Sequence, residues 1–260
     1  MPRIQVAPRV ILFGLLAVLL LTWTLVLTVD VFNILGARDR VFTQGETDFP
    51  HVYFHWANNQ GPIEWFQWAF LVAGSVGAGI AAGIRFQCAS LHLAKAIAFF
   101  SLLLGVLAVK DAGSPRHIIA GHVESVTGEQ LALVSQLLVL LAMGSVALMA
   151  LFLLFPYLPR QTSERRYLLV GSLSYGVAAS MSATSFLWYE RAGEWILRVP
   201  FRGRVLEAPV LWEGQGQGTM FMDTVVEESV ELVGAGFLAA TALAILRSSL
   251  AAHEAQKIHD

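Results

Sequence analysis

Three glutamates near the start of the last apolar segment have the clearest potential for chemistry. Glu227, Glu228 and Glu231 are spaced so that, on an α-helix, their side chains fall along one stripe within about two turns. Like charges this close repel, so the three cannot all stay ionised in a partly dry site unless cations or protons lie between them. The pattern therefore predicts a site that binds something positive.

A purely structural explanation accounts for only part of this acidic run. Acids in the first turn of a helix interact favourably with its dipole, and Asp223 followed by Thr224 makes a good N-terminal cap. Glu231, however, lies a further turn in and is followed by an uninterrupted apolar run over residues 232–246. Ionisable residues inside a membrane span are costly and mark functional sites, so we expect a functional role for Glu228 or Glu231.

Other acids and histidines fall at the same ends of neighbouring apolar segments. Glu64 opens the second segment and Asp111 ends the third, and a short helix with two histidines is expected to follow. Oxygen and imidazole ligands suit zinc, iron or manganese. The two histidines are not four apart, the spacing with which a helical pair binds one metal. The predicted metal ligands are Glu64, Asp111, His117, His122, Glu228 and Glu231, and the predicted catalytic groups are Glu228, Glu231 and Asp111.

One further acid lies inside the first apolar segment. Asp30 follows Thr28 and Val29 and precedes Val31. An unpaired aspartate at that depth costs several kcal/mol. We therefore expect Asp30 to point into the bundle, toward an arginine, a histidine or a metal.

The elements that position these residues are predicted to be membrane-spanning helices. The chain has 260 residues, of which 56% are hydrophobic and only 14% are charged, whereas soluble domains carry about 25% charged residues. Runs of about 20 apolar residues cross the hydrocarbon core. The expected fold is an all-α polytopic transmembrane bundle, a single membrane domain over residues 1–260. Its six spans are about 9–34, 62–85, 94–110, 129–157, 166–189 and 224–248.

The segments between the spans predict the orientation. The short basic turn over residues 159–166 favours the cytoplasm. Both termini are then cytoplasmic, and of the nineteen acids only Glu164, Glu254 and Asp260 lie inside. The outer loop over residues 190–223 includes an alternating stretch, residues 196–206, that fits a short hairpin. The first segment exceeds the apolar core of a signal peptide, so we expect a retained helix.

Charge and cysteine content exclude other classes. The net charge of −2 excludes the basic footprint of a nucleic-acid-binding protein. The single cysteine, Cys88, excludes a disulfide within the chain and a cysteine-cluster metal site.

Three short motifs carry a resemblance to a known kind of protein. They are Gly61-Pro62-Ile63-Glu64-Trp65, the stretch from Asp111 to His117, and Glu227-Glu228-Ser229-Val230-Glu231-Leu232-Val233-Gly234. With them the chain resembles a loose group of uncharacterised bacterial multi-pass inner-membrane proteins. The resemblance covers most of the spans and implies a bacterial inner membrane, but this group supplies no activity.

Three functions fit these observations. The leading hypothesis is a metal-dependent hydrolase or transferase at the outer leaflet, acting on a lipid or lipid-linked substrate, in which the metal polarises an oxygen and activates water. A second is a proton- or cation-coupled carrier that uses Asp30, Glu228 and Glu231. A third is a non-catalytic membrane subunit or assembly factor. Membrane lipids are the only partners that the sequence itself predicts.

Overall fold

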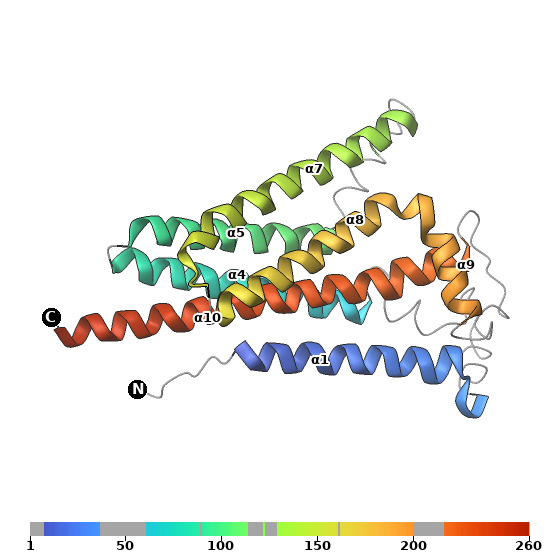
Figure 1. Ribbon diagram of the computed structural model, residues 1–260, viewed down its shortest axis with the longest axis horizontal. Coiled ribbons are helices and arrows are strands. Elements are labelled where there is room, and N and C mark those ends of the chain that lie inside the picture. Colours follow the sequence, from blue (N-terminus) through green and yellow to red (C-terminus); the bar gives the residue numbers. More distant parts are fainter. Residues whose placement is uncertain are drawn as a thin grey trace. The chain divides into compact units, whose positions relative to one another are not determined.

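The computed structural model describes residues 8–36, 61–88, 90–113, 122, 129–160, 162–199 and 216–259. Every regular element in these ranges is a helix, and they contain no strand (Figure 1). The all-α prediction is confirmed for this part of the chain. The elements are α1 (Pro8–Leu25), the π-helix η1 (Val26–Val31), the 3-10 turn η2 (Ile34–Gly36), α4 (Pro62–Gln87), α5 (Leu91–Gly113), α7 (Glu129–Leu154), the 3-10 turn η3 (Phe155–Tyr157), α8 (Ser163–Arg198), α9 (Gln217–Phe221), the π-helix η5 (Met222–Glu227) and α10 (Glu228–His259).

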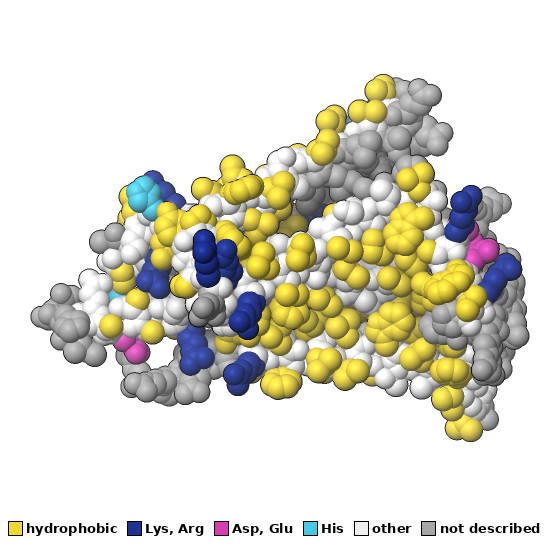
Figure 2. All heavy atoms as spheres, viewed as in Figure 1, with side chains coloured by type: hydrophobic (Ala, Val, Ile, Leu, Met, Phe, Trp, Pro, Cys, Tyr) yellow, Lys and Arg dark blue, Asp and Glu magenta, His cyan; other side chains and the backbone are white. Residues whose placement is uncertain are grey.

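Four helices of the described part are long and apolar enough to cross a membrane. They are Pro8–Val31, Pro62–Gln87, Leu91–Lys110 and Gly218–Lys257. Hydrophobic side chains also cover much of the visible surface of the described helices, as suits helices that face lipid (Figure 2). The chain is therefore a membrane protein with four candidate spans in this part.

The outer loop was predicted too long, and this is a correction. Helix α8 continues past the expected end at residue 189 as far as Arg198, and the helix resumes at Gln217. Glu194 and Arg198 form an i,i+4 ion pair of 3.4 Å inside the extension. Leu197 is buried among apolar side chains there. Residues 196–198 are consequently helical and not part of a hairpin; residues 200–215 lie outside the described ranges.

By its internal contacts the chain divides into two compact units, each built from separate stretches of sequence. Unit 1 comprises Met1–Phe13, Gln67–Leu173 and Gly234–Asp260, and unit 2 comprises Gly14–Phe66 and Ser174–Val233. Helices α1, α4, α8 and α10 contribute residues to both units. Each unit is described separately below.

Unit 1 packs helices through small residues. A Cβ added at Gly74 would lie only 3.0 Å from the Cα of Ala239, so α4 and α10 approach closely at this point. Next to it, Ser75 of α4 and Ser101 of α5 each donate a hydrogen bond to the other's carbonyl oxygen, at 2.9 and 2.7 Å. These contacts hold the helices of unit 1 together without any charged group.

Unit 2 has an apolar cluster in which both π-helices take part. Val26 and Val31 of η1 pack with Phe221, with Val225 of η5 and with Leu197 of α8. The ring of Trp23 meets the ring of Phe221 edge-on at 6.4 Å. The cluster therefore fixes η1, η5 and the end of α8 against one another.

Candidate functional site

Each of the two π-helices that meet in unit 2 contains a buried acid. Asp30 lies in η1 and is fully buried, and Glu227 is the last residue of η5 and is also buried. A π-helical turn adds a residue to the regular helix, which is rare and occurs frequently at functional sites. The π-helical geometry and the buried acids therefore occur in the same two segments, which makes both segments candidates for function. The expectation that Asp30 points into the protein is confirmed by its burial.

The central contact of the site joins Glu227 to a tyrosine of α8. The Tyr189 hydroxyl donates a hydrogen bond to Oε2 of Glu227, and the Tyr189 side chain is completely buried. The ring of Trp188 lies edge-on against Tyr189 at 5.1 Å. A buried tyrosine hydroxyl usually has a hydrogen-bond partner, and here the partner is a carboxyl oxygen of η5. This pair is therefore a firm link between α8 and η5.

A second carboxylate positions the segment that leads into η5. Oε2 of Glu190 accepts hydrogen bonds from the backbone nitrogen of Thr219 at 2.9 Å and from its hydroxyl at 2.8 Å. Thr219 lies in the first turn of α9, whose backbone N–H groups lack partners within the helix. Glu190 thus caps α9 from the neighbouring helix.

Two glycines allow α8 and α9 to come this close. A Cβ placed on Gly193 of α8 would collide with the backbone of Gly218 of α9, and one placed on Gly218 would meet the carbonyl oxygen of Glu190. The helices touch backbone to backbone at this crossing. Together with the cap at Thr219, the crossing sets the position of η5 and hence of Glu227.

Unit 2 as a whole collects buried acids. The buried acidic side chains are Asp30, Glu64, Glu227 and Glu231. None of the buried side chains in the described part of the chain is lysine, arginine or histidine. Burying several acids together is unfavourable unless protons or cations are shared among them.

The predicted ligands are only partly brought together. Glu64 and Glu231 are both buried in unit 2, whereas Glu228 is half-buried. Asp111 belongs to α5 in unit 1, and nothing further is described of its side chain. His122 is helical and exposed.

The predicted metal centre therefore stays a prediction. His117 lies outside the described residues, so its place relative to Glu64 and Glu231 is not part of the structure. Among the residues that are described, no group of three or more histidines, cysteines, aspartates or glutamates could hold a metal ion.

Sequence reasoning missed two members of this site. It placed Glu227 in the acidic stripe, although not among the predicted ligands, and it gave no role to Tyr189 or Glu190. A signal was available, because Tyr189 and Glu190 stand together where the apolar part of α8 ends. A tyrosine there has an apolar ring for the core and a hydroxyl that needs a partner.

Comparison with protein-family models, with curated proteins and with solved structures finds no match for this chain. The argument about function therefore depends on the site itself.

Proposed function

We propose that the protein is a six-span bacterial inner-membrane protein whose unit 2 exchanges protons at buried carboxyl groups, as a proton-coupled carrier does. The observation that carries this proposal is the burial of four acids in one unit, one of which accepts a hydrogen bond from Tyr189. An ionised carboxylate loses its hydration when it is buried, so such groups take up a proton or a cation readily.

The π-helical turns favour a functional role over a purely structural one. The candidate span Pro8–Val31 ends in η1, and the candidate span Gly218–Lys257 contains all of η5. Such turns within a helix occur frequently at functional sites. The two turns contain Asp30 and Glu227.

The proposed topology assigns the fourth and fifth spans to α7 and α8. These helices have 26 and 36 residues, and about 20 are enough to cross the hydrocarbon core. The basic turn between them, residues 159–166, is then cytoplasmic, as are both termini. Asp30 and Glu227 come to lie toward the outer leaflet.

A metal-dependent hydrolase or transferase acting on a lipid or lipid-linked substrate is the second candidate. It is favoured by the burial of Glu64 and Glu231, two of the predicted ligands, in the same unit. Asp111, His117, His122 and Glu228 complete the proposed ligand set, and zinc, iron or manganese would suit it.

The experiment that tests the first proposal is infrared difference spectroscopy of the purified protein during a pH titration. A protonated carboxyl absorbs at its own carbonyl frequency, and we expect such a band at neutral pH. Glu227→Gln should remove part of it. Glu194→Gln is the matched control, because Glu194 belongs to the same unit but its side chain is 42% exposed.

Metal analysis of the same samples separates the two candidates. About one equivalent of metal per chain that disappears in Glu231→Gln, but persists in His253→Ala, would favour the metal centre. A titration without any protonated carboxyl in the wild type contradicts the proton-exchange proposal. If neither signal is found, a non-catalytic membrane subunit becomes the better explanation.

A further inference from the structure

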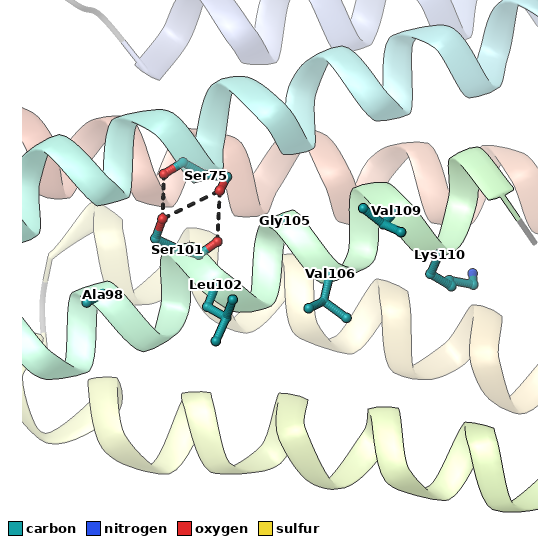
Figure 3. Close-up of a pocket in the computed structure, with 8 residues that line it drawn as sticks. All are labelled: Ser75, Ala98, Ser101, Leu102, Gly105, Val106, Val109 and Lys110. Carbon is teal, nitrogen blue, oxygen red and sulfur yellow. Dashed lines mark hydrogen bonds between the residues drawn. The ribbon is translucent and has the colours of Figure 1, made fainter. Parts of the chain in front are cut away.

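A groove of about 620 Å³ lies along one side of α5 in unit 1 (Figure 3). Its lining comes from one face of α5, with Ser75 of α4 beside it. The volume falls within the range of small-molecule sites, about 300–1,000 Å³. The α5 residues of the lining include Ser101, Leu102, Gly105, Val106, Val109 and Lys110.

The chemistry of the groove changes along its length. Near one end, Ser75 and Ser101 donate their hydroxyl hydrogens to each other's carbonyl oxygens, so both donors are already used (Figure 3). The middle is formed by aliphatic side chains and Gly105. Lys110 lines the opposite end and is the only charged residue among the described residues that line the groove. The groove thus suits a ligand with an apolar body and an anionic head.

The length of the groove along α5 is close to the thickness of one leaflet of a bilayer. Lys110 is the last residue of the candidate span Leu91–Lys110, so it lies at the level where lipid headgroups begin. From Lys110 to Ala98, the far end of the lining, the helix rises by about 18 Å. Half of the hydrocarbon core is about 15 Å thick.

The wall of the groove is also open to lipid. Leu102 is 60% exposed and Val109 is 67% exposed, although both belong to an apolar span. Aliphatic side chains that are exposed in this way within a span face acyl chains. A lipid can therefore enter the groove from the side.

We propose that this groove binds one acyl chain of an anionic phospholipid, with the lipid phosphate at the Lys110 ammonium group. The long lysine side chain reaches the headgroup region while its methylene groups stay against apolar surface. The aliphatic wall and the paired serines accommodate the tail. This site is separate from the acids of unit 2 and does not depend on the function proposed for them.

Native mass spectrometry of the detergent-purified protein tests the headgroup. The probes are phosphatidylglycerol and phosphatidylcholine with identical acyl chains. We expect phosphatidylglycerol to be retained about fivefold better, the factor for one lysine at an anionic lipid surface. Lys110→Gln should bring the ratio close to one. Lys95→Gln is the matched control, because Lys95 is exposed on the same helix but does not line the groove.

A second pair of variants tests the acyl-chain site. Val106→Trp fills the groove and should lower the retention of both lipids, whereas Val72→Trp should not, because Val72 is 52% exposed on α4 outside the groove. If Val106→Trp unfolds the protein, Leu102→Trp replaces it, since that position is still more exposed.

The proposal is overturned if Lys110→Gln and Lys95→Gln change the lipid ratio equally. It is also overturned if a folded Val106→Trp variant keeps both lipids as the wild type does. Such results would mean that lipid binds everywhere on the surface and not in this groove.

Discussion

Polar side chains between helices in unit 1 meet as matched donors and acceptors, whereas unit 2 collects acids. In unit 1, Ser75 and Ser101 satisfy each other, and Arg85 donates to the hydroxyl of Ser249 at 3.0 Å and to the carbonyl of Ser248 at 3.3 Å. In unit 2, four acids are buried, and one of them, Glu227, accepts a hydrogen bond from the buried Tyr189 phenol. Buried carboxyl groups can exchange protons, whereas hydroxyl pairs such as Ser75 and Ser101 serve to hold helices together.

This difference is the reason why the proposed proton exchange is assigned to unit 2. Neutral hydroxyl pairs inside a membrane protein are worth only about 0.6 kcal/mol each. Buried acids reduce stability unless they bind something, and they persist where function requires them. In the proposed function, unit 1 is therefore the scaffold and unit 2 contains the candidate site.

The largest effect is expected where α8 crosses α9 in unit 2. In Gly193→Ala the new methyl group collides with the backbone of Gly218, which cannot move aside as a flexible side chain could. We expect a loss of about 3 kcal/mol or more in the free energy of unfolding, at the upper end of what overpacking costs. Thermal unfolding in detergent measures it.

Gly83→Ala in α4 of unit 1 is the control for this crossing. Nothing lies within 4 Å of a Cβ at Gly83. Alanine also has the higher helix propensity, so this variant should be neutral or more stable by up to about 1 kcal/mol. Equal losses in both variants would mean that the close backbone contact at Gly193 is not a constraint.

A smaller effect is expected at the hydrogen bond between Tyr189 and Glu227. Tyr189→Phe removes the donor, and we expect a loss of about 0.5–1.5 kcal/mol in the free energy of unfolding, the usual net contribution of one hydrogen bond. In Glu227→Gln the amide can still accept the bond, so stability should fall less or even rise. A double-mutant cycle from thermal unfolding measures the coupling between the two positions.

Infrared spectra of the same variants separate a functional role of Glu227 from a purely structural one. If Glu227 serves only to hold α8 and η5 together, the infrared band of protonated carboxyl groups should be the same in Tyr189→Phe and in the wild type. If Glu227 exchanges protons, removing its donor should shift the pH at which the band disappears. A coupling near zero would contradict the bond itself.

The sequence predicted which residues are buried better than it predicted which residues meet. Hydropathy alone indicated that Asp30 and Glu231 lie inside apolar segments, and both are buried. The Tyr189–Glu227 bond joins residues 38 positions apart, and no local pattern reports such a contact. Tyr189, the hydrogen-bond donor to Glu227, was missed for this reason.

Two features of the backbone could not be predicted from the sequence either. A π-helical turn changes the register by one residue, and the apolar periodicity around Asp30 is too uniform to show such a change. The extension of α8 to Arg198 was hidden because its short alternating stretch fits either a strand or a helix face. The helical conformation of this stretch is stabilised by tertiary packing, because Leu197 is buried in the apolar cluster of unit 2.

The smallest effect is expected at the serine pair of unit 1, and it tests the other side of the comparison. Ser101→Ala removes one of the two hydroxyl donors, while the Ser75 hydroxyl keeps its bond to the Ser101 carbonyl. We expect a loss of about 0.6 kcal/mol, because the carbonyl of Ser75 remains bonded within its own helix. Ser145→Ala is the control, since its hydroxyl donates to the Leu141 carbonyl one turn earlier in α7.

Neither variant should change the infrared band of protonated carboxyl groups. A loss above about 2 kcal/mol in Ser101→Ala would exceed the range for neutral hydrogen bonds between membrane helices. A change in that band would show that unit 1 takes part in proton exchange, and the division between a scaffold and a site would no longer hold.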